Sequence, residues 1–171
     1  MKQFLIPAEK PIVHNSAFVA QDAVLVGGVT VGEFASIWYQ CVLRGDINRI
    51  KIGARTNIQD GTVIHVSDDF AAIVGNGVSV GHRAIIHACE IGDETLVGMG
   101  AIVMDGAIIG PQCIIGAGAM VTKNFHAPEG SLIVGSPARI VRALSAEERQ
   151  KNVALAAKYV EVARRYRELA V

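Results

Sequence analysis

Aliphatic residues recur at every sixth position along most of the chain. This spacing is neither the 3.6 residues of an amphipathic helix nor the two of an isolated strand, so it predicts the hexapeptide repeats of a parallel β-helix. Each hexapeptide forms one short strand and one corner, and three of them close a triangular coil around the inward aliphatic side chains. The repeating positions are Val13, Val19, Leu25, Val31, Ile37, Leu43, Ile52, Ile58, Ile64, Val74, Val80, Ile86, Ile91, Val97, Val103, Ile109, Ile115 and Val121.

These eighteen positions predict an all-β prism of about six coils over residues 1–126. The turn-rich segment that follows, with two proline and glycine clusters, predicts connecting turns over 127–144. From residue 145 the pattern changes to helical spacing, and Ser145 with Glu148 forms a capping box. We therefore expect one domain, in which a C-terminal α-helix over 145–171 packs on the β-helix.

Composition narrows the possible partners. The chain has 171 residues, of which 51% are hydrophobic and 19% charged, so it predicts a compact globular protein. Sixteen basic and sixteen acidic residues cancel, which favours neither nucleic acid nor an anionic membrane as a partner. No apolar run has transmembrane length, and the N-terminus lacks the pattern of a signal peptide. Three cysteines without CxxC spacing, Cys41, Cys89 and Cys113, fit buried thiols in a reducing cytoplasm.

Three histidines fall within this apolar repeat, and coil counting separates them into two columns. His65 and His87 each follow an inward aliphatic residue by one place, so they stack one coil apart, with Arg44 in the layer below. His82 follows Val80 by two places and belongs to a different face, above Asp60. Two stacked imidazoles suit two ligands of one metal ion, but His82 cannot join them within one chain.

A second subunit completes the arrangement. If the second column of one subunit meets the first column of its neighbour, Arg44 pairs with Asp60 and the three histidines converge. A contact between two different faces is heterologous, and a three-sided prism closes it as a three-membered ring. We therefore predict a homotrimer with metal sites between subunits. Three neutral imidazoles suit Zn²⁺, and also Fe²⁺ or Co²⁺, and leave one coordination position open for an acidified water.

The combined motifs resemble those of the γ-class carbonic anhydrase family, over nearly the whole chain. The matching segments are Arg44-Gly45-Asp46, Asn57-Ile58-Gln59-Asp60-Gly61-Thr62-Val63-Ile64-His65, Val80-Gly81-His82 and His87. The resemblance implies left-handed β-helix trimers that hydrate CO₂ to bicarbonate, reversibly, by metal-bound hydroxide at the subunit interface. It implies metal ligation by His65, His82 and His87, and interface ion pairs from Arg44, Asp46 and Asp60. It also implies that Gln59 orients solvent or substrate and that a C-terminal tyrosine, for which Tyr159 is the candidate, lines the site.

The chain departs from the family pattern at the groups that export the proton. Well-characterised members carry a glutamate directly after the aspartate of the Arg-Gly-Asp-like segment and another in an acidic loop. Here Ile47 follows Asp46, and the loop offers Asp68 and Asp69 instead. Hydration turns over only if the proton of the water leaves, so the missing glutamates put efficient turnover in question.

Two other function classes stay open. Hexapeptide β-helix trimers include acetyltransferases, and Gly135-Ser136-Pro137-Ala138 resembles the segment where those chains leave the solenoid. An acyltransferase uses a single histidine as general base and needs no three converging histidines. A metal-bearing trimer could instead bind bicarbonate without catalysis, and a thioesterase or other hydrolase could use the same metal-activated water.

Overall fold

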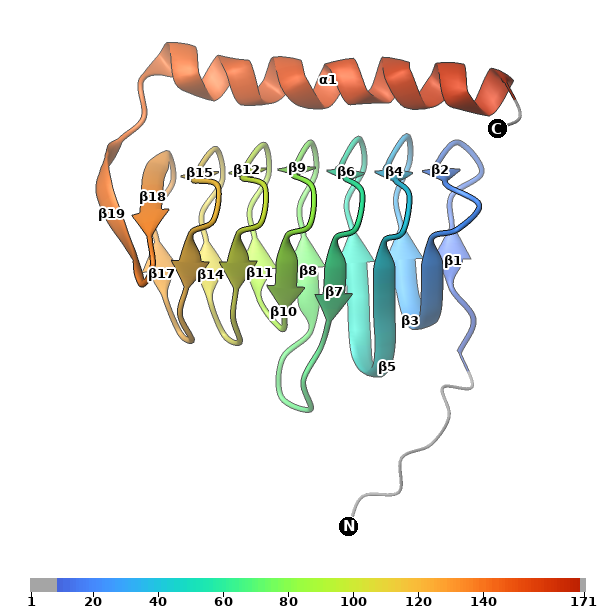
Figure 1. Ribbon diagram of the computed structural model, residues 1–171, viewed down its shortest axis with the longest axis horizontal. Coiled ribbons are helices and arrows are strands. Elements are labelled where there is room, and N and C mark those ends of the chain that lie inside the picture. The colour runs from blue at the N-terminus through green and yellow to red at the C-terminus, as the bar shows by residue number, and fades with distance from the viewer. Residues whose placement is uncertain (1–8, 170–171) are drawn as a thin grey trace.

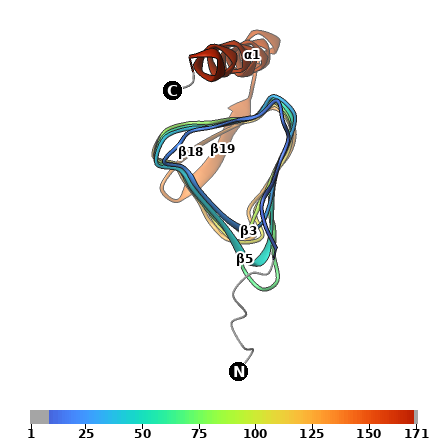
Figure 2. The same ribbon diagram turned by 90° about the vertical axis from the view of Figure 1, so that its right-hand side faces the viewer.

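The computed structural model describes residues 9–169, which form a parallel β-helix with one α-helix along its side (Figure 1). Viewed along its axis, the coil is triangular, and the helix lies outside one of the three sides (Figure 2). The β-helix and the C-terminal helix predicted from the sequence are both confirmed. Seven strands stack in register on the side next to the helix, one layer more than the six coils expected.

The three faces of the coil take their names from what lies on them. The helix face contains β2 (Phe18–Val19), β4 (Ser36–Ile37), β6 (Asn57–Ile58), β9 (Ser79–Val80), β12 (Leu96–Val97), β15 (Ile114–Ile115) and β18 (Ser131–Gly135), with β19 (Ala138–Ala143) antiparallel to β18. The histidine face contains the first parts of β3 (Val24–Val31) and β5 (Val42–Ile52), then β7 (Val63–His65), β10 (Ile85–His87), β13 (Ile102–Val103) and β16 (Met120–Val121). The loop face contains β1 (Ile12–Val13), the last parts of β3 and β5, then β8 (Ala72–Val74), β11 (Glu90–Ile91), β14 (Ile108–Ile109) and β17 (His126–Ala127).

The inward aliphatic side chains form one continuous core through the prism. From Val31 to Val121 every predicted inward position is buried. Val13 is 40% exposed, because it lies in the first coil of residues 9–169 and no other coil within this range covers it from below. Stacking also brings corner backbones together: a β-carbon on Gly53 would lie 2.3 Å from the carbonyl oxygen of Gly75. Glycine is therefore required where one corner rests directly on the next.

The first break in the six-residue spacing is a long strand and not a loop. Between Leu43 and Ile52 the chain continues as β5, which pairs with β7 at its start and with β8 at its end. β3 follows the same path one coil earlier, and both strands extend the corner between the histidine and loop faces (Figure 2). This extension carries Arg44 and Asp46 along the corner that also holds His65.

The prediction of connecting turns over 127–144 is wrong, because this segment contains β18 and β19. The six-residue spacing continues from Val121 through Ala127 and Ile133, and both of these are buried. Pro128 and Gly130 belong to a further corner, where the Gly130 amide donates to the carbonyl of Pro111 in the coil below. Proline and glycine thus mark a corner of the seventh layer here, and β19 then returns antiparallel before the helix begins.

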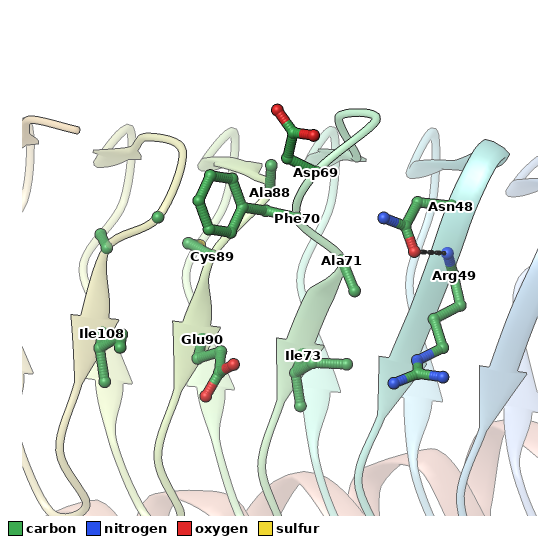
Figure 3. A pocket seen from close by; sticks show the side chains of 12 residues that line it. Asn48, Arg49, Asp69, Phe70, Ala71, Ile73, Ala88, Cys89, Glu90 and Ile108 are labelled. Carbon is green, nitrogen blue, oxygen red and sulfur yellow. Dashed lines mark hydrogen bonds between the residues drawn. The ribbon is translucent and has the colours of Figure 1, made fainter. Parts of the chain in front are cut away.

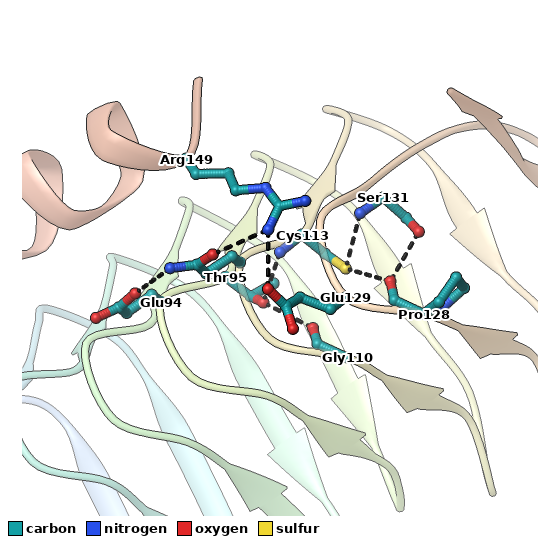
Figure 4. A network of polar contacts seen from close by, with 9 residues as sticks. Glu94, Thr95, Gly110, Cys113, Pro128, Glu129, Ser131 and Arg149 are labelled. Carbon is teal, nitrogen blue, oxygen red and sulfur yellow. Dashed lines mark hydrogen bonds and ion pairs between the residues drawn. The ribbon is translucent and has the colours of Figure 1, made fainter. Parts of the chain in front are cut away.

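Helix α1 (Ala146–Glu168) is fastened to the last coils at its start. The predicted capping box is present, with Ser145 accepting from the Glu148 amide and Glu148 accepting from the Ser145 amide. Arg149 donates to Glu129 at 2.8 Å, a contact drawn in Figure 4, and to the side-chain oxygen of Gln112 at 3.2 Å. From there α1 runs back along the helix face to the level of β2 (Figure 1).

The cysteines agree with their predicted structural role. All three are buried and free, and burial raises the pKa of Cys41 to about 11 and of Cys89 to about 12. Such thiols stay protonated and unreactive at neutral pH. Among residues 9–169, no helix has both the length and the apolar character that crossing a bilayer requires.

Candidate metal centre

His65 and His87 end two neighbouring strands of the histidine face, β7 and β10. They are register partners in the parallel pairing, as coil counting predicts. Nδ1 of His65 lies 3.1 Å from Nε2 of His87. Two nitrogens bound to one tetrahedral zinc at about 2.0–2.1 Å each are about 3.3 Å apart. The spacing of the two rings therefore suits two ligands of a single ion.

Asp46 holds the opposite side of the His65 ring. Its Oδ1 lies 2.9 Å from Nε2 of His65, and its other oxygen accepts from Arg44. Burial by itself raises the pKa of Asp46, but hydrogen bonds from His65 and Arg44 outweigh it and lower that pKa. An ionised carboxylate only accepts, so Nε2 of His65 carries the proton and Nδ1 keeps its lone pair toward His87.

Asp105 does the same for His87, although the sequence pattern did not reveal it. Its Oδ1 lies 2.6 Å from Nδ1 of His87, and its Oδ2 lies 3.2 Å from Nζ of Lys123. Coil counting indicates a different residue: Ile86 pairs with Val103, which puts Met104 level with His87. Asp105 is one residue further on, and its side chain reaches back across the corner. In the sequence, the only sign of this contact is that Asp105 follows His87 by three hexapeptides.

The lone pairs of His65 and His87 converge as a result. Each ring gives its N–H to a carboxylate, so the two nitrogens that face each other across 3.1 Å are both acceptors in the neutral rings. Two facing lone pairs repel unless a cation or a proton lies between them. Borderline-soft divalent ions prefer such imidazole nitrogens, and metal-binding histidines commonly donate their other N–H to a carboxylate. The donor set therefore fits the implied divalent metal.

His82 lies on the other edge of the histidine face, at the corner after β9. Its Nδ1 is 2.8 Å from Oδ2 of Asp60, which lies one coil below it as predicted, and its side chain is 45% exposed. Within residues 9–169 of one chain, no three histidine, cysteine, aspartate or glutamate side chains gather closely enough to hold a metal ion. The exposed ring of His82 is available to a neighbouring subunit, as the two-column prediction requires.

The predicted partners of the ion pairs are engaged inside the chain. Arg44 pairs with Asp46, and Asp60 pairs with His82. The contact between Arg44 of one subunit and Asp60 of the next stays a prediction, because it joins two chains.

Gln59 lies buried at the end of β6, directly before Asp60. Its amide nitrogen donates to Oδ1 of Asn57 at 3.0 Å, and Asn57 in turn donates to Oγ of Ser79 at 2.8 Å. This network runs along the outer side of the helix face. It places Gln59 on the edge of the coil that carries Asp60 and His82, not on the edge that carries His65.

Tyr159 of α1 lies on the same edge. Its ring packs against Trp38 with centroids 5.8 Å apart, and together with Asp60 it lines a cavity of about 400 Å³ between α1 and the coil. Burial, with a smaller contribution from the charge of Asp60, raises the pKa of Tyr159. Its role in packing is therefore evident, and its role in the site stays a prediction.

The loop that contains Asp68 and Asp69 lies beside the corner that follows His87. Nδ2 of Asn48 donates to the carbonyl of Ser67 at 3.1 Å, which holds the loop against β5. A cavity of about 300 Å³ opens next to it, and its lining includes Asp69, Phe70 and Ala88, the residue after His87. Figure 3 shows Asp69 and Phe70 at the loop end of this cavity. A carboxylate of the loop thus shares a cavity with the residue that follows His87.

Comparison with known proteins agrees with this architecture. The family model of the bacterial transferase hexapeptide, six repeats, matches residues 88–123. A solved structure of a proposed acetyltransferase from Bacillus cereus superposes with a TM-score of 0.93 at 40% identity, covering 95% of this chain and 94% of that one.

Curated relatives point to a narrower family. A probable carbonic anhydrase of Methanocaldococcus jannaschii is 45% identical over 88% of this chain and 95% of its own length. The mitochondrial gamma carbonic anhydrase 1 of Arabidopsis thaliana is 43% identical over 81% of this chain, which spans about half, 52%, of that relative. The chain therefore belongs to the γ-class carbonic anhydrase family of hexapeptide-repeat proteins.

Proposed function

We propose that this protein is a homotrimeric, metal-dependent carbonic anhydrase that interconverts CO₂ and bicarbonate at sites between its subunits. The observation that supports this most strongly is the pairing of the three histidines with aspartates. His65, His87 and His82 each direct one ring nitrogen to an aspartate, which leaves the other nitrogen of each ring for a metal. Family membership supports the same activity.

An apolar ladder supports the trimer. Outward side chains along the histidine face stack in register between the column of His82 and the column of His65 and His87. Val63 and Ile85, at the level of the histidines, are 39% and 40% exposed. Val42, Ile102 and Met120 of the same strip are half-buried, and a continuous aliphatic strip at the surface, flanked by polar residues, is typical of a protein interface. The ladder consists of Val24, Val42, Val63, Ile85, Ile102 and Met120.

The position of the ladder determines which residues meet. If the histidine faces of three subunits surround a common axis, each His82 edge meets the edge of the next subunit that carries His65 and His87. Arg44 then reaches Asp60 of the neighbour, and His82 completes a three-imidazole site. Closed threefold rings are the natural outcome of a heterologous contact that repeats.

Each of the predicted site residues then has a distinct role. A divalent ion in this site, zinc or alternatively iron or cobalt, supplies an acidified water as nucleophile near neutral pH. Asp46 and Asp105 hold the rings of His65 and His87. Gln59 and Tyr159, both on the His82 edge, orient solvent or substrate from the neighbouring subunit. Asp68 and Asp69 in the loop transfer the proton to bulk solvent, the task for which relatives use glutamates.

The cellular location of the protein is less constrained. A cytoplasmic site stays a prediction from the three buried free cysteines, and the Arabidopsis relative is a mitochondrial protein.

Metal content and CO₂ hydration together test the proposal. We expect about one metal ion per chain in the purified trimer and hydration, measured by stopped flow, that a chelator abolishes and added metal restores. Substitution of His82 by alanine should remove both. His126→Ala is the matched control, because His126 is an exposed histidine of the loop face. Bound metal without CO₂ hydration would reject the carbonic anhydrase activity and leave a bicarbonate-binding trimer or a metal-dependent hydrolase.

Acyl transfer is the second candidate, favoured by the Bacillus cereus neighbour proposed to be an acetyltransferase. An enzyme of this class would transfer an acyl group without bound metal and would survive chelation. Incubation of the chelated protein with acetyl coenzyme A and a panel of amine and alcohol acceptors distinguishes an acyltransferase from a carbonic anhydrase. Acyl transfer by the chelated protein would favour this candidate, and its absence beside chelator-sensitive hydration would exclude it.

A further inference from the structure

A symmetric row of charges follows the corner between the histidine and loop faces. It begins with a cation and a carboxylate, continues with two imidazoles, and ends with a carboxylate and a cation. The first half is Arg44, Asp46 and His65, and the second half is His87, Asp105 and Lys123. Asp105 and Lys123 lie outside the signature that identifies the family in this sequence.

We infer that Asp105, supported by Lys123, is a positioning residue that keeps Nε2 of His87 unprotonated and directed at the metal position. This inference rests on the proposed metal site. Nδ1 of His87 and Oδ1 of Asp105 lie 2.6 Å apart, closer than the 2.9 Å between Nε2 of His65 and Asp46. An isolated neutral imidazole carries its proton on either nitrogen, and a carboxylate at Nδ1 selects the form with Nε2 free.

Backbone hydrogen bonds between neighbouring corners hold Asp105 beside His87. The Gly106 amide donates to the carbonyl of Ala88 at 2.8 Å, so the corner after Asp105 is tied to the corner after His87. The Asn124 amide donates to the carbonyl of Asp105 at 2.9 Å, which ties the same corner to the coil of Lys123. Gly106 has a φ of +68° and a β-carbon there would lie 2.3 Å from Oδ1 of Asn124. Three successive corners are thus locked in one stack.

Lys123 fixes the carboxylate from its second oxygen. Its Nζ lies 3.2 Å from Oδ2 of Asp105, while Oδ1 faces His87. Although burial raises the pKa of Asp105, the hydrogen bonds from His87 and Lys123 outweigh it and lower that pKa. With His87 on one oxygen and Lys123 on the other, the carboxylate is held in this orientation by the chain itself. Lys123 itself is 61% exposed, so its contribution is smaller than that of Asp105.

The test measures two independent properties of the assembled protein. The first is the tautomer of His87 in the metal-free protein, from nitrogen-15 chemical shifts in long-range proton–nitrogen spectra. The second is zinc affinity, from competition with a chelator of known affinity. Asp105→Ala should shift the His87 ring toward the form protonated at Nε2 and weaken zinc binding roughly 10- to 100-fold. Asp105→Asn keeps an acceptor oxygen and should recover much of both, and Lys123→Met should lose less than Asp105→Ala.

Asp22→Ala is the matched control, since Asp22 is an exposed corner aspartate whose carboxylate accepts from the backbone amide of Gln40. It should leave both readouts unchanged. The inference is overturned if Asp105→Ala, or Asp105→Leu where alanine does not fold, keeps the wild-type tautomer and the wild-type zinc affinity. A wild-type protein that binds neither zinc, iron nor cobalt would instead reject the proposed function, and the tautomer would still decide whether Asp105 orients His87.

Discussion

His65 and His82 lie on opposite edges of one face of the same chain. His65 ends β7, and His82 follows β9 at the previous corner of the next coil, where it pairs with Asp60 and not with another histidine. A metal site that needs both residues must therefore take them from two different subunits. This separation allows the intersubunit site to be tested by complementation.

Coexpression of His65→Ala and His82→Ala chains with different tags should restore metal binding that neither variant shows alone. In a mixed ring, the His82→Ala chain offers an intact His65 and His87 edge, and the His65→Ala chain offers an intact His82. Each ring that contains both variants has one complete interface, which is about a third of its interfaces. Metal content of doubly tagged trimers is the measurement, and a site within one chain would give no recovery.

The apolar ladder predicts where a charge breaks the trimer. Ile85→Lys places an ammonium at the middle of the histidine face without entering the core, because the side chain of Ile85 is already 40% exposed. We expect a folded monomer by analytical ultracentrifugation and loss of metal with the interface. Ile108→Lys is the matched control, since Ile108 is 43% exposed on the loop face. Equal dissociation by both variants would show that the histidine face is not the interface.

A further proton acceptor can be added directly beside Asp46. Ile47 is 40% exposed on β5 directly after Asp46. Ile47→Glu should raise the rate of CO₂ hydration roughly tenfold or more in dilute buffer, because a carboxylate there can accept the proton of the attacking water. Concentrated buffer should reduce the difference by carrying the proton itself.

Ile47→Gln separates this effect from packing, since glutamine has nearly the same size and cannot titrate. Stopped-flow rates at several buffer concentrations provide the comparison. If the glutamine variant gains as much as the glutamate variant, the gain does not come from proton transfer.

The start of α1 predicts a loss of stability in acid. Hydrogen bonds from Arg142 and from the Ser145 amide lower the pKa of Glu148 from 4.5 to about 2. Since its pKa is lower in the folded state, the stabilisation is complete above pH 4.5 and is lost as the pH falls toward 2. Glu148→Gln should therefore be less stable near neutral pH but show a flatter decline over this window. Melting temperatures across it are the measurement.

Glu33→Gln serves as the control for this change, because Glu33 is an exposed glutamate outside the cap. It should follow the wild-type decline. A Glu148→Gln variant whose melting temperature also falls in parallel with the wild type would show that the cap does not titrate in this window.

The six-residue repeat predicted most of the fold because the repeating aliphatic residues are those that are buried in the core. Every third hexapeptide returns to the same face, so one spacing specified the inward residues, the coil and the stacking of His65 on His87. The seventh layer was missed although Ala127 and Ile133 keep the spacing. Pro128 and Gly130, which lie between these two residues, resemble the end of a solenoid in the sequence. In the structure they form a corner like those of the earlier coils.

The site was predictable only where it follows the register. Asp60 lies in its predicted layer beneath His82 because the loop between β7 and β8 adds residues at a corner without changing the pairing of β6 with β9. Asp105 was not predictable in this way, because the one-residue slip after β10 displaces it from the level of His87. Its contact depends on how the side chain turns at the corner, which no spacing encodes.

The sequence by itself determined the parallel coil, its inward residues, the terminal helix and the two histidine columns, since these follow from periodic burial of aliphatic side chains. The tertiary structure decided which nitrogen of each ring is held by a carboxylate, that β5 extends the corner beside His65, and that an exposed aliphatic ladder separates the columns. These features arise from side-chain directions and from contacts between coils. Such contacts depend on three-dimensional packing, and the spacing of residues along the chain does not specify them.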